Sequence, residues 1–139
     1  MTLDAPRTFV IAPPSRGTSV HQDLLDVARF FGLEGERTGE LMVRLTRTSA
    51  KTIDRALKEE RVEYRPHLHV VAEFVREART YLFQVRDWAD WTAQDARDMR
   101  AWLDGGTIVV DGRSYSPFEM LTDESLARRA LSELSSVTE

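Results

Sequence analysis

The chain has 139 residues, which suits one compact domain or two very small ones. Hydrophobic residues make up 42% and charged residues 30%, a balance that argues against both a disordered chain and a membrane protein. With no cysteine, disulfides, thiol nucleophiles and thiolate metal sites are excluded. Because residues 1–14 lack the basic start and long apolar core of a secretory signal, we expect a cytoplasmic protein.

The net charge of −4 argues against a generic nucleic-acid coat, but the charges are unevenly distributed. Residues 44–58 contain five basic residues and one acidic residue, whereas residues 87–104 contain five aspartates and two arginines. These two segments could serve different partners, or they are the solvated faces of two ordinary helices.

The N-terminal residues 1–18 include a strand-like stretch at residues 8–12 that two prolines close, so we expect an extended or flexible arm. A helix should follow. Ser19 and Gln22 have the spacing of a capping box, apolar residues then recur at helical spacing, and Gly32 supplies the end.

Two short helices are predicted next, one over residues 36–45 and one that Thr48 or Ser49 can cap. Their inward-facing residues should be Leu41, Met42, Leu45, Ile53, Ala56 and Leu57.

Residues 40–58 fit a helix-turn-helix, in which the second helix lies in the major groove of DNA and its first turns meet base edges. The turn lacks the usual glycine, and Asp54 would face a polyanion. The same pattern therefore also fits a helix pair that keeps the fold without the DNA contacts. The residues that could meet phosphates or bases are Arg44, Arg47, Ser49, Lys51, Thr52, Arg55 and Lys58.

After Pro66, an apolar stripe from Val71 to Val85 predicts a long helix of about five turns that includes Tyr81 and Leu82. His67 and His69 stand at its start. Because no third ligand has a suitable spacing, we expect a partly exposed helix start rather than a metal site.

A helix from Thr92 to Gly105 should carry Trp102 in its apolar stripe, which makes Trp102 a core residue. Trp88 and Trp91 stand beside aspartates at a helix junction. Either a place in the core or a place on a partner surface fits these two tryptophans.

Residues 107–115 have the composition of a β-hairpin, because Asp111 and Gly112 tolerate the positive φ angles of a tight type I′ turn. Ser116 then starts a capping box for the next helix, and a final helix should extend to Leu134.

Together these elements predict a mainly α protein. A helix-turn-helix domain covers residues 19–65, and a long connecting helix with a small helical module and a short β-hairpin covers residues 66–139. No Gly-rich phosphate loop, G-x-S-x-G or H-E-x-x-H motif occurs. We therefore expect no enzyme, no catalytic residue and no cofactor.

The stretch MRAWLDGGTIVVDGRSYSPFEMLTDESLARRAL resembles the C-terminal toxin-binding module of Xre/MbcA/ParS-type antitoxins. The resemblance lies in the Trp102-Leu103 pair, the Gly112-Arg113 loop, the Pro-x-x-x-Leu motif of residues 117–121, and the helix from Leu126 to Leu134. LMVRLTRTSAKTIDRAL is similar to the N-terminal half of the family, so the resemblance covers about residues 20–135. The family has a shorter loop where this chain places RSYS and the preceding TIVV.

This resemblance implies an antitoxin that catalyses nothing and covers the active site of a RES-domain toxin, an enzyme that consumes NAD⁺. Its N-terminal half would form a homodimer and could bind operator DNA. Two alternatives remain: a stand-alone helix-turn-helix regulator or phage-type repressor, and an interaction module that binds no DNA. The expected toxin contacts are Trp88, Trp91, Asp111, Arg113, Tyr115, Phe118 and Glu119.

Overall fold

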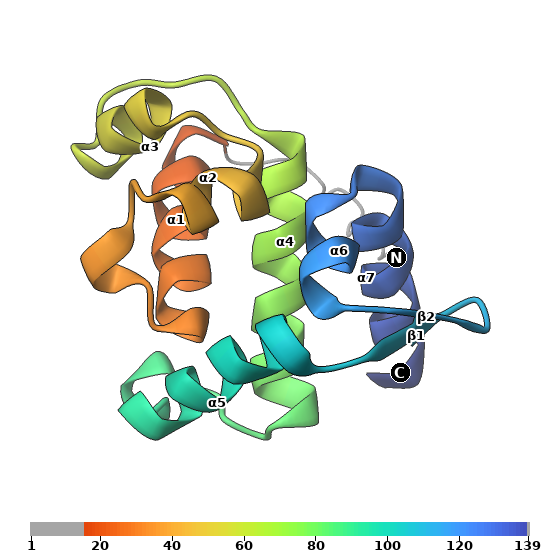
Figure 1. Cartoon of the computed structure of the whole chain (residues 1–139). Helices are drawn as coiled ribbons and strands as arrows, with labels where there is room; N and C mark the ends of the chain where they lie inside the picture. The colour runs from red at the N-terminus through yellow and green to blue at the C-terminus, as the bar shows by residue number, and fades with distance from the viewer. Residues whose placement is uncertain (1–15, 139) are drawn as a thin grey trace, which may run out of the picture.

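The computed structural model describes residues 16–138 and is mainly helical with one two-stranded hairpin, which confirms the predicted fold class (Figure 1). The strand-like stretch predicted at residues 8–12 lies outside the described residues. The described helices include none that is long and apolar enough to cross a membrane.

Seven α-helices and two strands follow one another along the described chain. The helices are α1 (Arg16–Phe31), α2 (Glu40–Thr46), α3 (Ala50–Leu57), α4 (Pro66–Glu77), α5 (Ala93–Gly105), α6 (Pro117–Thr122) and α7 (Glu124–Thr138). The strands are β1 (Ile108–Val110) and β2 (Arg113–Tyr115). Single turns of 3-10 helix occur at Glu34–Glu36 and Trp88–Asp90, and a π-helical turn covers Ala78–Leu82.

The first helix differs from its prediction at one end only. Because α1 begins at Arg16, Ser19 has a position inside the helix, and the capping box predicted there is wrong. Gly32 does end the helix: its φ is 67°, and the following Leu33 N–H donates to the Ala28 carbonyl at 2.7 Å.

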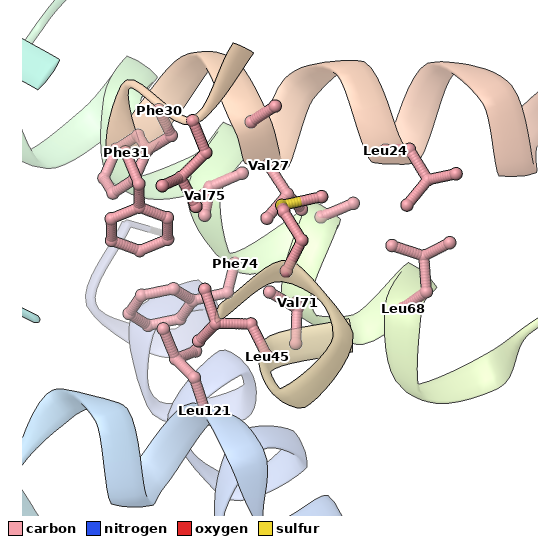
Figure 2. Close-up of a cluster of buried hydrophobic side chains, with 14 of the residues drawn as sticks. Leu24, Val27, Phe30, Phe31, Leu45, Leu68, Val71, Phe74, Val75 and Leu121 are labelled. Carbon is pink, nitrogen blue, oxygen red and sulfur yellow. The ribbon is translucent and has the colours of Figure 1, made fainter. Parts of the chain in front are cut away.

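Helix α4 is the centre of the molecule, with α1 on one side and α6 and α7 on the other (Figure 1). Figure 2 shows apolar side chains from α1, α2, α4 and α6 meeting in one cluster. Val27 from α1, Val71 from α4 and Leu121 from α6 are all buried there. The elements on either side of the predicted boundary between residues 65 and 66 thus share one core.

The long helix predicted as far as Val85 is shorter than expected. The α-helix ends at Glu77, and the π-helical turn that follows changes the direction of the side chains. Tyr81 and Leu82, predicted to continue the apolar stripe, are therefore 55% and 54% exposed. The Arg79 guanidinium fixes the new path, because it donates to the carbonyl oxygen of Val85 at 3.0 Å.

The hairpin and the helix after it confirm the local signals in the sequence. Asp111 and Gly112 have φ angles of 54° and 80°, as a type I′ turn requires, and Val109 is paired with Ser114. Ser116 then accepts a hydrogen bond from the Glu119 N–H in the predicted capping box, with Pro117 as the first residue of α6.

Candidate DNA and partner interfaces

In the turn between α2 and α3, Arg47 has the left-handed backbone conformation that a glycine usually adopts. Arg47 has φ 52° and ψ 42°, a conformation that costs a non-glycine residue about 1–2 kcal/mol. Two buried threonines hold the turn: Thr46 Oγ1 donates to the Met42 carbonyl at 2.6 Å, and Thr48 Oγ1 donates to the Thr46 carbonyl at 3.0 Å. A tight turn between the two short helices therefore forms without the glycine.

Ser49 caps α3, since its side chain accepts a hydrogen bond from the Thr52 N–H at 3.2 Å. The helix buries Ile53 and Ala56 and turns its opposite face to solvent. Thr52 is half-buried, and the other predicted DNA contacts on this face are exposed: Ser49, Lys51, Arg55 and Lys58.

Acidic residues occupy part of this basic face. Lys58 Nζ lies 3.1 Å from Asp54 Oδ2, and Arg55 Nε lies 3.3 Å from Glu60 Oε1. Asp54 is thus matched with a lysine one turn along the helix, which offsets the repulsion that it would exert on a phosphate chain. Within residues 16–138, Lys51 makes no ion pair.

Arg44 and Arg47 face the C-terminal half of the protein. The Arg44 guanidinium lies over the Phe118 ring, 4.6 Å from its centre, and Arg47 donates to the Thr122 carbonyl at 3.0 Å. The structure therefore brings a predicted DNA contact, Arg44, together with a predicted toxin contact, Phe118.

Trp91 belongs to the core, so the prediction that it lies on a partner surface is wrong. The side chain is 4% exposed, stacks on Phe30 with 5.0 Å between ring centres, and donates from Nε1 to the Phe30 carbonyl at 3.3 Å. Its buried donor is satisfied, as a core tryptophan requires. Trp88 is half-buried, and the Arg79 guanidinium lies 4.5 Å from its ring.

The other predicted toxin contacts have several roles. Asp111 binds Arg129 at 2.6 Å, and Arg113 is exposed at the start of β2. Tyr115 packs partly against the core, and Glu119 accepts the Ser116 N–H in the capping box. Of this set, Asp111, Arg113 and Glu119 are exposed, whereas Tyr115 and Phe118 are half-buried.

An apolar groove that sequence reasoning missed lies between the π-helical turn, α5, β1 and α7. It has a volume of about 260 Å³, and Phe83, Trp102 and Leu134 are among the residues that line it. Leu82 and Val109 also line it and are more than half exposed. The sequence does not reveal this groove, because Leu82 fits the apolar stripe of the predicted long helix and is therefore assigned to the core.

A charged network between α1 and α4 was also missed. Arg76 contacts Asp23 and Asp26, both at 2.6 Å, and Glu73 at 2.8 Å. Burial alone would lower the pKa of Arg76, but its hydrogen bonds to Asp26 and Asp23 raise that pKa above its ordinary value. The two aspartates stand in the apolar stripe of α1, where the sequence alone shows no partner for them.

The imidazole of His67 and that of His69 make hydrogen bonds to different groups, so the two rings have no common binding partner in the described part of the chain. His67 is buried, with Nε2 2.8 Å from the Leu121 carbonyl oxygen, so the prediction of a partly exposed position is wrong for this residue. Burial lowers the pKa of His67. For His69, the hydrogen bond to Asp23 at 3.0 Å raises the pKa, against a smaller lowering by burial.

Comparison with known proteins gave no match, whether with protein-family models, curated proteins or solved structures. The function is therefore inferred from the α2–α3 geometry, the exposed surfaces and the sequence motifs.

Proposed function

We propose that the protein is a helix-turn-helix antitoxin, which binds operator DNA through α3 and neutralises a toxin through its C-terminal half. The observation that carries the proposal is the α2–α3 unit. Its left-handed turn at Arg47 and its N-cap at Ser49 present a polar, basic helix face to solvent. In helix-turn-helix proteins such a face enters the major groove.

The DNA-binding role rests on the residue types along that face. Lys51 and Arg55 are one turn apart on α3 and both exposed, so one DNA strand could meet both side chains. An arginine at such a position can read guanine with two hydrogen bonds, and a lysine can neutralise a phosphate. Operator binding also requires a cytoplasmic protein, as the sequence leads us to expect.

The toxin-binding role rests on the C-terminal motifs and on the exposed apolar groove. The motifs resemble those of antitoxins that cover RES-domain toxins, which consume NAD⁺. The groove supports the proposal because exposed apolar residues gathered in one place are typical of protein-binding sites. A homodimer that offers two toxin-binding halves is part of the same proposal.

Co-expression with the toxin encoded by the adjacent gene tests the toxin-binding role. We expect the two proteins to co-purify and the NAD⁺ consumption of the toxin to be suppressed. Replacing Leu82 and Phe83 by Ser should weaken the complex. Tyr64→Ser changes an exposed aromatic residue before the start of α4, outside the groove, and should not weaken it. Separate elution of the two proteins, with NAD⁺ consumption unchanged, would rule out the antitoxin role.

A gel-shift titration with the DNA upstream of the gene tests the other role. We expect a complex whose affinity falls as salt rises, because neutralised phosphates release counterions. The double change Lys51→Ala and Arg55→Ala should abolish the shift while toxin binding persists.

A stand-alone regulator is the second candidate. The α3 face is complete within one chain and needs no toxin to form, which favours this candidate as well. It predicts a DNA shift together with no toxin complex. An interaction module without DNA binding predicts unchanged migration even at low salt.

A further inference from the structure

A hollow that three arginines line lies beside α3, between this helix and the loop that follows it. The chain leaves α3 and returns past it toward α4 (Figure 1). Residues 61–65 of this loop, together with Thr52 and Arg55, line this open hollow. The hollow has a volume of about 730 Å³. We call it the α3 side hollow.

The α3 side hollow has the chemistry of a phosphate site. Arg55, Arg61 and Arg65 line it with one carboxylate among the lining residues, that of Glu63, and a second carboxylate, that of Glu60, pairs with Arg55. Guanidinium groups bind phosphate oxygens with paired hydrogen bonds.

Hydrogen bonds fix the loop to the helix-turn-helix at both ends. Arg55 donates to the Arg61 carbonyl at 3.1 Å, and Arg65 donates to the Arg47 carbonyl at 3.2 Å. The hollow is therefore held in a defined position beside α3, the proposed recognition helix.

The dimensions of DNA determine what meets this surface. A helix with its side chains is about 10–12 Å across, and the major groove is about 12 Å wide. When α3 fills the groove, a loop that runs beside it must lie against the sugar–phosphate strand at the groove's edge. We infer that the α3 side hollow binds this strand and that Arg61, with Arg65, contacts its phosphates; this inference rests on the proposed DNA binding.

The arginines near α6 have partners within the protein, whereas Arg61 in the loop after α3 has an exposed side chain, and this difference favours the proposed contact. Arg44 and Arg47 face α6, where Phe118 and the Thr122 carbonyl hold them. Arg61 is exposed, and among residues 16–138 it makes no ion pair. Arg61 thus replaces the phosphate contact that the sequence predicts for Arg47.

The test is the salt dependence of DNA binding by Arg61→Ala, measured between 50 and 200 mM salt, a range in which phosphate contacts dominate the response. We expect binding to weaken by about 5- to 10-fold near 0.1 M salt and the slope of log K against log salt to fall by about 1. The loss should be equal for operator and unrelated DNA, because phosphates carry no sequence information. Arg61→Lys should keep the slope of the wild type.

Arg86→Ala is the matched control, since Arg86 is an exposed arginine beyond the opposite end of α4. If the wild type shifts DNA but Arg61→Ala behaves as Arg86→Ala does, the inference is wrong while the proposed function stands. A loss confined to operator DNA would assign Arg61 to base reading and also overturn it. If the wild type shifts no DNA at low salt, the proposed DNA binding and this inference fail together.

Discussion

Arg76 is the residue that connects the charges of α1 and α4. Its guanidinium binds two carboxylates, Asp23 and Asp26, that are almost completely removed from water on the opposing helix. A buried carboxylate is tolerated only when it is paired and hydrogen-bonded. One arginine therefore makes two acidic residues compatible with the apolar face of α1.

Arg76→Met should lower the free energy of unfolding by about 3 kcal/mol, because it leaves Asp23 and Asp26 buried without their cation. Urea denaturation followed by circular dichroism measures the loss. The matched change Arg86→Met removes an exposed arginine and should alter stability by less than about 0.5 kcal/mol. Equal effects of the two changes would mean that the network contributes nothing.

His69 belongs to the same network and should make stability depend on pH. Its pKa is raised in the folded protein, so its contribution is fully present below the unfolded value of about 6.5 and is lost as pH rises through the folded pKa. The groups that face it are Asp23, Glu73, Arg76 and the Tyr64 ring.

The check is the difference in unfolding free energy between the wild type and His69→Gln from pH 5.5 to 9. We expect this difference to be largest at the acid end and to shrink above neutrality. His67, whose pKa is lowered by burial, acts in the opposite direction but cancels because both proteins contain it. A difference that stays constant with pH would contradict the role given to Asp23.

At the scale of elements, the parts predicted well are those fixed by neighbouring residues. The helix start at Thr92, the capping box at Ser116 and the hairpin turn at Asp111 depend on contacts no more than three residues apart. The α3 face was predicted for the same reason. The end of α4 was not, because the π-helical turn depends on Arg79 and on the contact of Phe83 with Trp91.

The candidate surfaces show the same division. The exposed face of α3 follows from its helical period, whereas the apolar groove and the α3 side hollow require the positions of segments that no local pattern fixes. The sequence around Trp91 fits both a core and a surface role. Its core position depends on stacking against Phe30, which is distant in the sequence.

The two glycines at the end of α5, Gly105 and Gly106, differ in the space that surrounds their Cα atoms. A Cβ on Gly106 would collide with the Trp102 side chain and lie 2.7 Å from its carbonyl oxygen, whereas a Cβ on Gly105 would meet nothing within 4 Å. Gly106→Ala should therefore cost about 1–3 kcal/mol, and Gly105→Ala should stabilise the end of α5 by about 0.5 kcal/mol. Urea unfolding of both variants measures this, and equal stabilities would show that the Trp102 side chain and backbone move aside freely.

At the scale of the whole molecule, one core joins α1, α2 and α3 to the C-terminal half. Arg47 adds a hydrogen bond across the boundary predicted between residues 65 and 66, because its guanidinium donates to the Thr122 carbonyl in α6. A toxin bound near α6 would therefore touch the same packed unit that positions α3. Two halves that share a core should unfold in one step.

Met42→Ala tests this cooperativity, because Met42 is fully buried in α2 while all three tryptophans lie between residues 88 and 102. Loss of a buried methionine side chain should cost about 2–5 kcal/mol. If the halves unfold together, the urea midpoint from tryptophan fluorescence should fall by the same amount as the midpoint from circular dichroism. Val109→Ala, at an exposed position, should move neither midpoint. A fluorescence midpoint that stays at the wild-type value would mean that the elements from α4 onward fold without α2.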